Sequence, residues 1–199
     1  MWHTSVEQLL SKYSDESQVR EAMHRRAYQW FKRTLTWFQL PIIILSAASG
    51  SVQFLSKGFP DYEAHIITGT GTLSILVTII SSVMTYLKLG ETKSKHEQAQ
   101  IAWQRFHNSI AHQLAIHPDF RIPADEFLDE VKTSYERLFE LSPMVGNKFV
   151  DRIKKKVEKH STGRFQVPFY LNGYSHQRVW TDPDDSKNEE FEDNTVNEV

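Results

Sequence analysis

The stretch TGTGTLSILVTIISSVMTY, residues 68–86, is the part of the sequence that most strongly indicates the fold. It has no charged side chain, yet a hydroxyl group recurs about once per helical turn. Residues three or four apart lie on the same face of a helix. The stretch therefore predicts an apolar helix with one polar face, which meets either a neighbouring helix or water. The members of this face are Thr70, Ser74, Thr78, Ser81 and Thr85.

A second apolar block precedes this one. Residues 35–55 (LTWFQLPIIILSAASGSVQFL) and 66–87 contain 21 and 22 residues without a charge. At about 1.5 Å per residue, each helix would span the roughly 30 Å hydrocarbon core of a bilayer. A buried hairpin in a soluble domain is the alternative. Two adjacent charge-free blocks favour an all-α membrane protein with a two-helix transmembrane hairpin (35–87) and a short outer loop (56–65).

The first block has a polar face of its own. Gln39, Ser46 and Gln53 are spaced seven apart, and Ser49 lies between them. A glutamine amide without partners in hydrocarbon costs several kcal/mol. The polar faces of the two blocks could therefore pack against each other, inside a hairpin or an oligomer, or line a water-filled pore. One hairpin cannot enclose a pore, so the pore interpretation requires a cyclic homo-oligomer.

Charged side chains lie only at the ends of the two blocks, where they would form the mouths of such a pore. Ion preference would be set weakly at these entrances, and its sign is not predicted. The mouth residues are Lys57, Asp61, Glu63 and His65 outside, with Arg33 and Lys88 inside.

Basic side chains predict the orientation. Five Lys or Arg residues lie within 20–33, and three more follow the second block, whereas the loop has one lysine and two acids. The positive-inside rule then places both termini in the cytoplasm. The polar start of the chain predicts no cleavable signal peptide. Residues 1–34 predict amphipathic cytoplasmic helices, with Asp15 beginning the second of them.

The region 88–164 predicts a cytoplasmic helical domain. We expect the second span to continue without a break into an amphipathic helix. Its apolar face would either join neighbouring copies or pack against a helix at 124–141. This face comprises Ala99, Trp103, Phe106, Ile110 and Leu114.

Ser142 and Pro143 predict the start of a third cytoplasmic helix. Residues 143–164 contain seven basic and two acidic side chains, which would lie near anionic lipid headgroups. The basic positions on the helix itself are Lys148, Arg152, Lys155, Lys156 and Lys159. Residues 165–180 predict an extended segment. Residues 181–199, with eight acids and one lysine, predict a disordered tail.

Sequence signals for catalysis are weak. HEQAQ at 96–100 has Gln100 where a zinc-protease helix needs its second histidine. His107, His112 and His117 are five apart, which turns them away from a shared face. There is no cysteine, and no nucleophile–base pair or carboxylate pair stands out. We expect no enzyme activity, cofactor, metal or nucleic-acid partner.

The organisation of residues 15–140 resembles the SLATT group of two-transmembrane effector domains. The resemblance lies in a basic, tryptophan-bearing helix (YQWFKR), two spans with a short outer loop, and a long following helix (KHEQAQIAWQRFHNSIAHQL). It implies a membrane effector that forms pores or perturbs membranes, often downstream of a nucleotide-signal enzyme.

The sequence thus predicts an oligomeric two-span membrane protein that forms an ion-conducting pore lined by Ser, Thr and Gln side chains. The alternative is a membrane scaffold or adaptor, whose cytoplasmic helices recruit a soluble partner.

Overall fold

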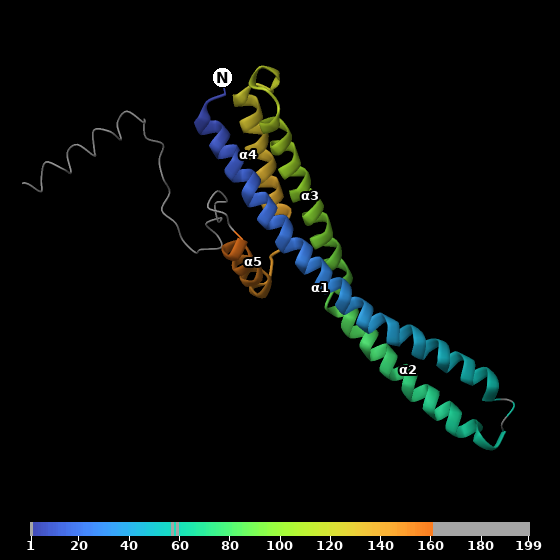
Figure 1. Ribbon diagram of the computed structural model, residues 1–199. Helices are drawn as coiled ribbons and strands as arrows, with labels where there is room; N and C mark the ends of the chain where they lie inside the picture. Colours follow the sequence, from blue (N-terminus) through green and yellow to red (C-terminus); the bar gives the residue numbers. More distant parts are fainter. Residues whose placement is uncertain (1, 57, 59, 161–199) are drawn as a thin grey trace, which may run out of the picture.

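The computed structural model describes residues 2–56, 58 and 60–160, and this part of the chain contains helices and no strand. Figure 1 shows a helical body at one end of the molecule and a two-helix hairpin projecting from it. Short 3-10 helices, Pro60–Tyr62 and Pro118–Phe120, lie in two of the connections. The long helices are α1 (Thr4–Ser56), α2 (Glu63–Tyr86), α3 (Leu89–Ala115), α4 (Ala124–Leu141) and α5 (Asn147–His160).

Helix α1 runs unbroken through 53 residues, about 80 Å. The predicted helix start at Asp15 is wrong, because the capping signal lies inside a face that α1 packs against the body. Leu10 and Ser17 are fully buried there, and the Ser17 hydroxyl donates to the carbonyl of Ser14 at 2.6 Å within the helix. Tertiary packing thus overrides a local helix-start signal.

The second half of α1 and the whole of α2 form the hairpin. Both helices are long and apolar enough to cross a membrane. Their large apolar side chains face outward: Trp37 is 79% exposed, Ile44 63% and Ile75 62%. The apolar segments are therefore not the core of this chain, and the soluble-hairpin alternative finds no support in the described residues.

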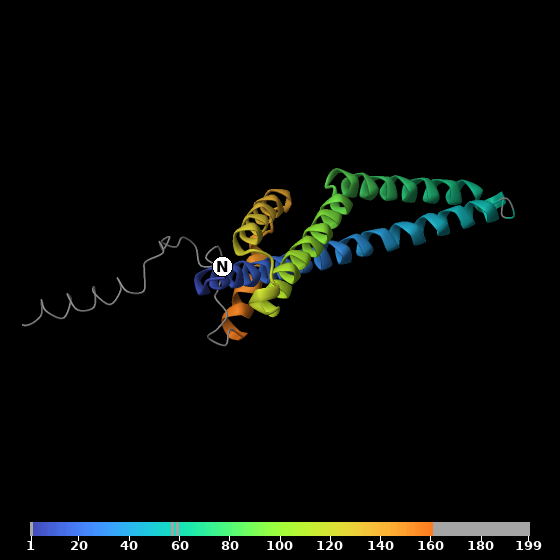
Figure 2. The same cartoon turned by 90° about the horizontal axis from the view of Figure 1, so that it is seen from above.

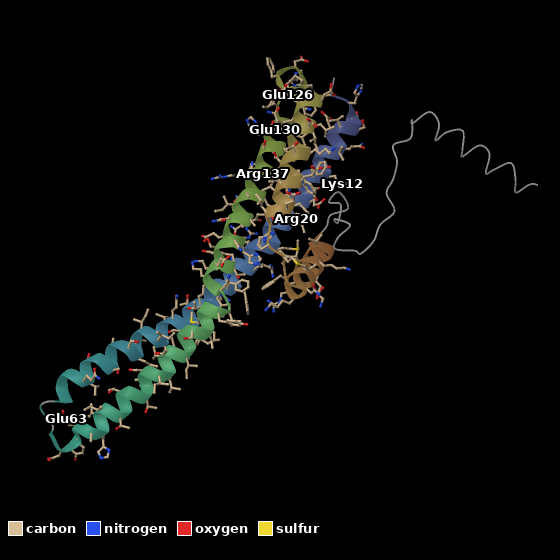
Figure 3. All side chains as sticks on the ribbon, turned by 180° about the vertical axis from the view of Figure 1, so that it is seen from behind. Lys12, Arg20, Glu63, Glu126, Glu130 and Arg137 are labelled. Carbon is tan, nitrogen blue, oxygen red and sulfur yellow. The ribbon has the colours of Figure 1, made fainter. Side chains whose placement is uncertain are left out.

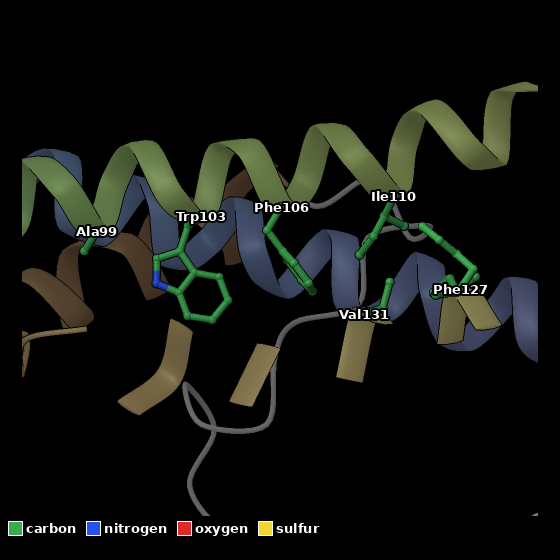
Figure 4. Close-up of a cluster of buried hydrophobic side chains, with 7 residues drawn as sticks. Ala99, Trp103, Phe106, Ile110, Phe127 and Val131 are labelled. Carbon is green, nitrogen blue, oxygen red and sulfur yellow. The ribbon is translucent and has the colours of Figure 1, made fainter. Parts of the chain in front are cut away.

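The core of the body lies between α1, α3 and α4. Leu10 of α1, Trp103 and Ile110 of α3 and Phe127 of α4 are at most 1% exposed. Figure 4 shows the α3 side chains pointing from one face of that helix towards α4 and α1. This packing fixes the body to one end of α1.

The predicted continuation of the second span into the cytoplasmic helix is wrong. Helix α2 ends at Tyr86, and Lys88 adopts the left-handed conformation with φ 47° before α3 begins at Leu89. Figure 2 shows the resulting angle: α3 bends away from the line of α2 and runs to α1. The turn lets the apolar face of α3 pack in the body while α2 stays in the hairpin.

The helix predicted to begin at Ser142 and Pro143 is α5, which begins at Asn147. Ser142 instead closes the C-terminus of α4, since its backbone N–H donates to the carbonyl of Leu138 at 3.0 Å. Its hydroxyl also accepts a hydrogen bond from the Trp103 indole at 2.8 Å. The predicted extended segment 165–180 and acidic tail 181–199 lie outside the described residues.

Candidate functional site: a polar crevice in the apolar hairpin

The hairpin contains a polar crevice between its two helices. Ser46, Ser49 and Gln53 of α1 and Ser74 and Thr78 of α2 line a hollow of about 320 Å³. The apolar and small residues that complete the lining are Leu45, Gly50, Leu73 and Val77. The structure thus brings parts of both predicted polar faces together within one subunit.

Four of the five hydroxyl groups on the predicted polar face of α2 are bonded to their own helix. Each donates to the carbonyl four residues earlier: Thr70 to Ile66 at 2.8 Å, Ser74 to Thr70 at 2.9 Å, Thr78 to Ser74 at 2.8 Å and Thr85 to Ser81 at 3.0 Å. Such back-bonding satisfies the donor without any partner helix. With the donor used, each hydroxyl oxygen can still accept hydrogen bonds from a neighbouring group or from water.

The glycines of the hairpin are not required by packing within the chain. Apart from its chain neighbours and the backbone of its own helix, a methyl group added at Gly50, Gly69 or Gly71 would meet no atom of the described residues within 4 Å. Small residues in membrane helices are commonly used for close contact with another helix. These positions therefore leave room for a neighbouring molecule.

Four of the predicted pore-lining residues lie outside the crevice. Gln39 is exposed on α1, in the part of the hairpin nearer the body, and Thr70 is buried on α2. Ser81 and Thr85 line a second hollow of about 540 Å³, on the part of α2 that adjoins the turn. The polar face of α2 therefore runs along the helix, and Ser74 and Thr78 in its middle line the crevice with α1.

The predicted mouth residues lie at the two ends of the hairpin. Asp61, Glu63 and His65 are exposed at the tip, where Figure 3 labels Glu63. Lys88 lies in the turn, with its ammonium group 3.9 Å from Glu91. Arg33 instead borders a pocket between α1 and α5. Lys57 lies outside the described residues.

The predicted packing face of α3 is covered inside the body. Ala99, Trp103, Phe106 and Ile110 belong to the core, and Leu114 packs against it. The face contacts both α1 and α4 of the same chain, so it is not available for joining neighbouring copies.

The predicted basic positions lie along α5. The Lys148 ammonium group is 3.7 Å from the centre of the Trp30 ring, a cation–π contact that ties the start of α5 to α1. Arg152 and Lys156 line the pocket beside α1. Lys155 is exposed, and Lys159 lies in the last turn of the helix.

Sequence reasoning missed a buried histidine pair beside the hairpin. His24 of α1 and His96 of α3 place their Nδ1 atoms 3.0 Å apart, and Phe31 stacks on the His96 ring. Burial, together with His96 and Arg20, lowers the pKa of His24 to about 4. Burial also lowers the pKa of His96. Neutral imidazoles can share one hydrogen bond at this distance, whereas two protonated rings would repel.

It also missed a buried ion pair in the body. The Arg20 guanidinium lies 2.8 Å from the Glu16 carboxylate and over the rings of Trp103 and Phe139. The Tyr135 hydroxyl donates to the same carboxylate, and burial followed by this bond raises the pKa of Tyr135. The His24–His96 and Glu16–Tyr135 contacts have no sequence signal, because they join residues 72 and 119 positions apart. Glu16 and Arg20 are four residues apart on α1, so their spacing could have indicated the ion pair but not its burial.

No cluster of three or more metal-ligating side chains occurs within the described residues. His107 is instead bonded to the Ser14 hydroxyl at 2.7 Å, and His117 lies 3.5 Å from Asp119.

Comparison with known protein families, curated proteins and solved structures finds no match for this chain. The resemblance to the SLATT group stays a prediction.

Proposed function

We propose that this chain is a two-span membrane protein whose copies assemble into an ion-conducting pore lined by the polar faces of α1 and α2. The observation that carries the proposal is the crevice lined by Ser46, Ser49, Gln53, Ser74 and Thr78 in a hairpin whose outer surface is apolar. An exposed apolar surface of this extent needs lipid or protein to cover it. A polar crevice within that surface favours contact with water.

The hydrogen bonds of α2 support a preference for cations. Because its hydroxyl hydrogens are directed to backbone carbonyls, the polar face offers mainly oxygen lone pairs to whatever lies beside it. Oxygen acceptors of this kind replace the hydration shell of a cation and offer little to an anion.

A pore requires several copies, because one hairpin leaves the crevice open on a side. The unfilled space at Gly50, Gly69 and Gly71 gives neighbouring hairpins a surface for close contact. Closed rings are the usual arrangement of identical chains. The basic flanks favour both termini in the cytoplasm, and α5 then lies on the side of anionic headgroups.

Conductance across a planar bilayer tests the proposal. We expect the reconstituted chain to conduct, and Thr78→Leu, which places an apolar side chain in the crevice, to reduce single-channel conductance several-fold. Thr72→Leu is the matched control. Thr72 is also exposed and bonded to its own helix, at 2.9 Å from the carbonyl of Thr68, but it does not line the crevice.

A purified oligomer that stays silent under varied voltage, pH and ligands would reject the pore. An equal change of conductance in both variants would reject the crevice as the lining of the pore.

A scaffold or adaptor is the second candidate, and exposed apolar side chains on the body favour it. Phe139, Leu141 and Met144 are 56%, 71% and 97% exposed at the end of α4 and in the following loop. They could bind a soluble partner. In that case the protein would not conduct, and Ser81→Leu or Thr78→Leu would either dissociate the oligomer or have little effect. A pore would instead stay assembled and change its conductance.

A further inference from the structure

A pocket between α1 and α5 is rich in positive charge. Its volume is about 780 Å³, and five cationic side chains line it. Three come from α1 and two from α5, and none of the described lining residues is acidic. The five are Arg25, Arg26, Arg33, Arg152 and Lys156.

Three of these five cationic side chains have no acidic partner within the described residues. Arg26, Arg33 and Arg152 form no ion pair with any residue that the structure describes, and Arg25 is 3.6 Å from Glu21 in an exposed contact. Like charges gathered across two helices repel one another, so their placement is unfavourable without an anion. The pocket therefore has a positive potential that a ligand could offset.

The floor of the same pocket is apolar. Val19, Ala22, Phe149, Ile153 and Val157 lie beneath the cationic rim, and Val19 and Ile153 belong to the small cluster that holds α5 against α1. Gln18 and Gln29 add amide donors. A ligand that fits must be anionic at several points and also have an apolar part.

The geometry points to a site for a phosphorylated amphiphile with two or more phosphate groups, which bridges α1 and α5. Arginine guanidinium groups bind phosphate through two parallel hydrogen bonds, and arginine supplies four of the five cations here. Such a ligand could be a phosphorylated membrane lipid, since Arg33 lies two residues before the first apolar block, or a free nucleotide, whose base is the apolar part.

The inference stands apart from pore formation, because a chain that conducts nothing can still bind at this pocket. Isothermal titration calorimetry of the full chain in neutral detergent micelles tests it with three probes: inositol trisphosphate, ATP and a short-chain phosphatidylinositol bisphosphate. We expect at least one probe to bind. Arg26→Gln combined with Arg152→Gln should weaken that binding about tenfold or more.

The control removes the same charge from the same helices outside the pocket, through Lys32→Gln combined with Lys155→Gln. It should change affinity by no more than about twofold, since exposed charges at a distance are screened. Equal melting temperatures show that both variants are folded. Binding of the lipid probe alone assigns a lipid ligand, and binding of a soluble probe assigns a free phosphate compound. No binding at about millimolar probe, or equal loss in both double variants, would overturn the inference.

Discussion

Arg20 makes polar and aromatic contacts that connect three helices of the body. Its guanidinium is 13% exposed, pairs with a carboxylate that is 7% exposed, and lies over aromatic rings from α3 and α4. Removing one partner of a buried pair leaves an uncompensated charge, which typically costs about 3–5 kcal/mol. The Arg20 guanidinium therefore connects α1, α3 and α4.

We expect Arg20→Met to lower the free energy of unfolding by about 3 kcal/mol, because the Glu16 carboxylate loses its counter-charge. Combining it with Glu16→Gln should restore part of the loss. Arg25→Met is the control, since its ion pair is exposed and should contribute less than about 1 kcal/mol. Denaturant unfolding in micelles, followed by circular dichroism, measures all three. A loss in Arg20→Met no larger than in Arg25→Met would contradict this account.

Helices α1 and α3 are held together next to the hairpin by the His24–His96 contact. Because the folded-state pKa of His24 is about 4 and its ordinary value 6.5, the unfolded chain binds this proton more tightly. The stability that the neutral pair contributes is therefore complete above about pH 6.5 and is lost as the pH falls towards 4.

We expect the melting temperature of the chain in micelles to fall as the pH is lowered from 7 to about 4.5, with a stability loss of up to about 1.4 kcal/mol per pH unit for each group. His24→Gln should flatten this dependence. His112→Gln, at an exposed position of α3, should leave it unchanged. The same slope in all three proteins would show that other groups cause it.

Sequence patterns were sufficient for the apolar helices and less so for their boundaries. The structure confirms an all-helical arrangement of the described residues with two long apolar helices, because length and lack of charge are properties of the segments themselves. The unbroken α1, the turn at Lys88 and the late start of α5 depend on packing between segments distant in sequence. Lys88 adopts the left-handed conformation at this turn although it is not a glycine, so the residue type at this position does not indicate a turn.

The candidate site was predictable to a similar degree. The hydroxyl face of α2 follows from its spacing, and five of the predicted lining residues meet in the crevice. The sequence could not show that α1 and α2 bring these residues together in one chain, or that Arg33 borders the α5 pocket. Both depend on the fold.

One continuous helix, α1, borders two different surfaces of the molecule: a cationic pocket and an uncharged polar crevice. Residues 18–33 of α1 border the cationic pocket, and residues 45–53 border the crevice. Between them begins an outward apolar surface that nothing in the described chain covers. The proposed function uses this arrangement: the body lies in water, the hairpin lies in lipid, and copies meet through their polar faces.

Cysteine accessibility around α2 tests that claim most directly, because the chain has no cysteine of its own. Single cysteines at Ser74 and Thr78 lie in the crevice, whereas Ile75 and Ile79 face outward and are 62% and 54% exposed. With the full chain reconstituted in lipid vesicles, we expect a charged methanethiosulfonate reagent to modify Ser74→Cys and Thr78→Cys and to spare Ile75→Cys and Ile79→Cys. Protection of all four positions, or modification of all four at equal rates, would contradict a hydrated polar face within lipid.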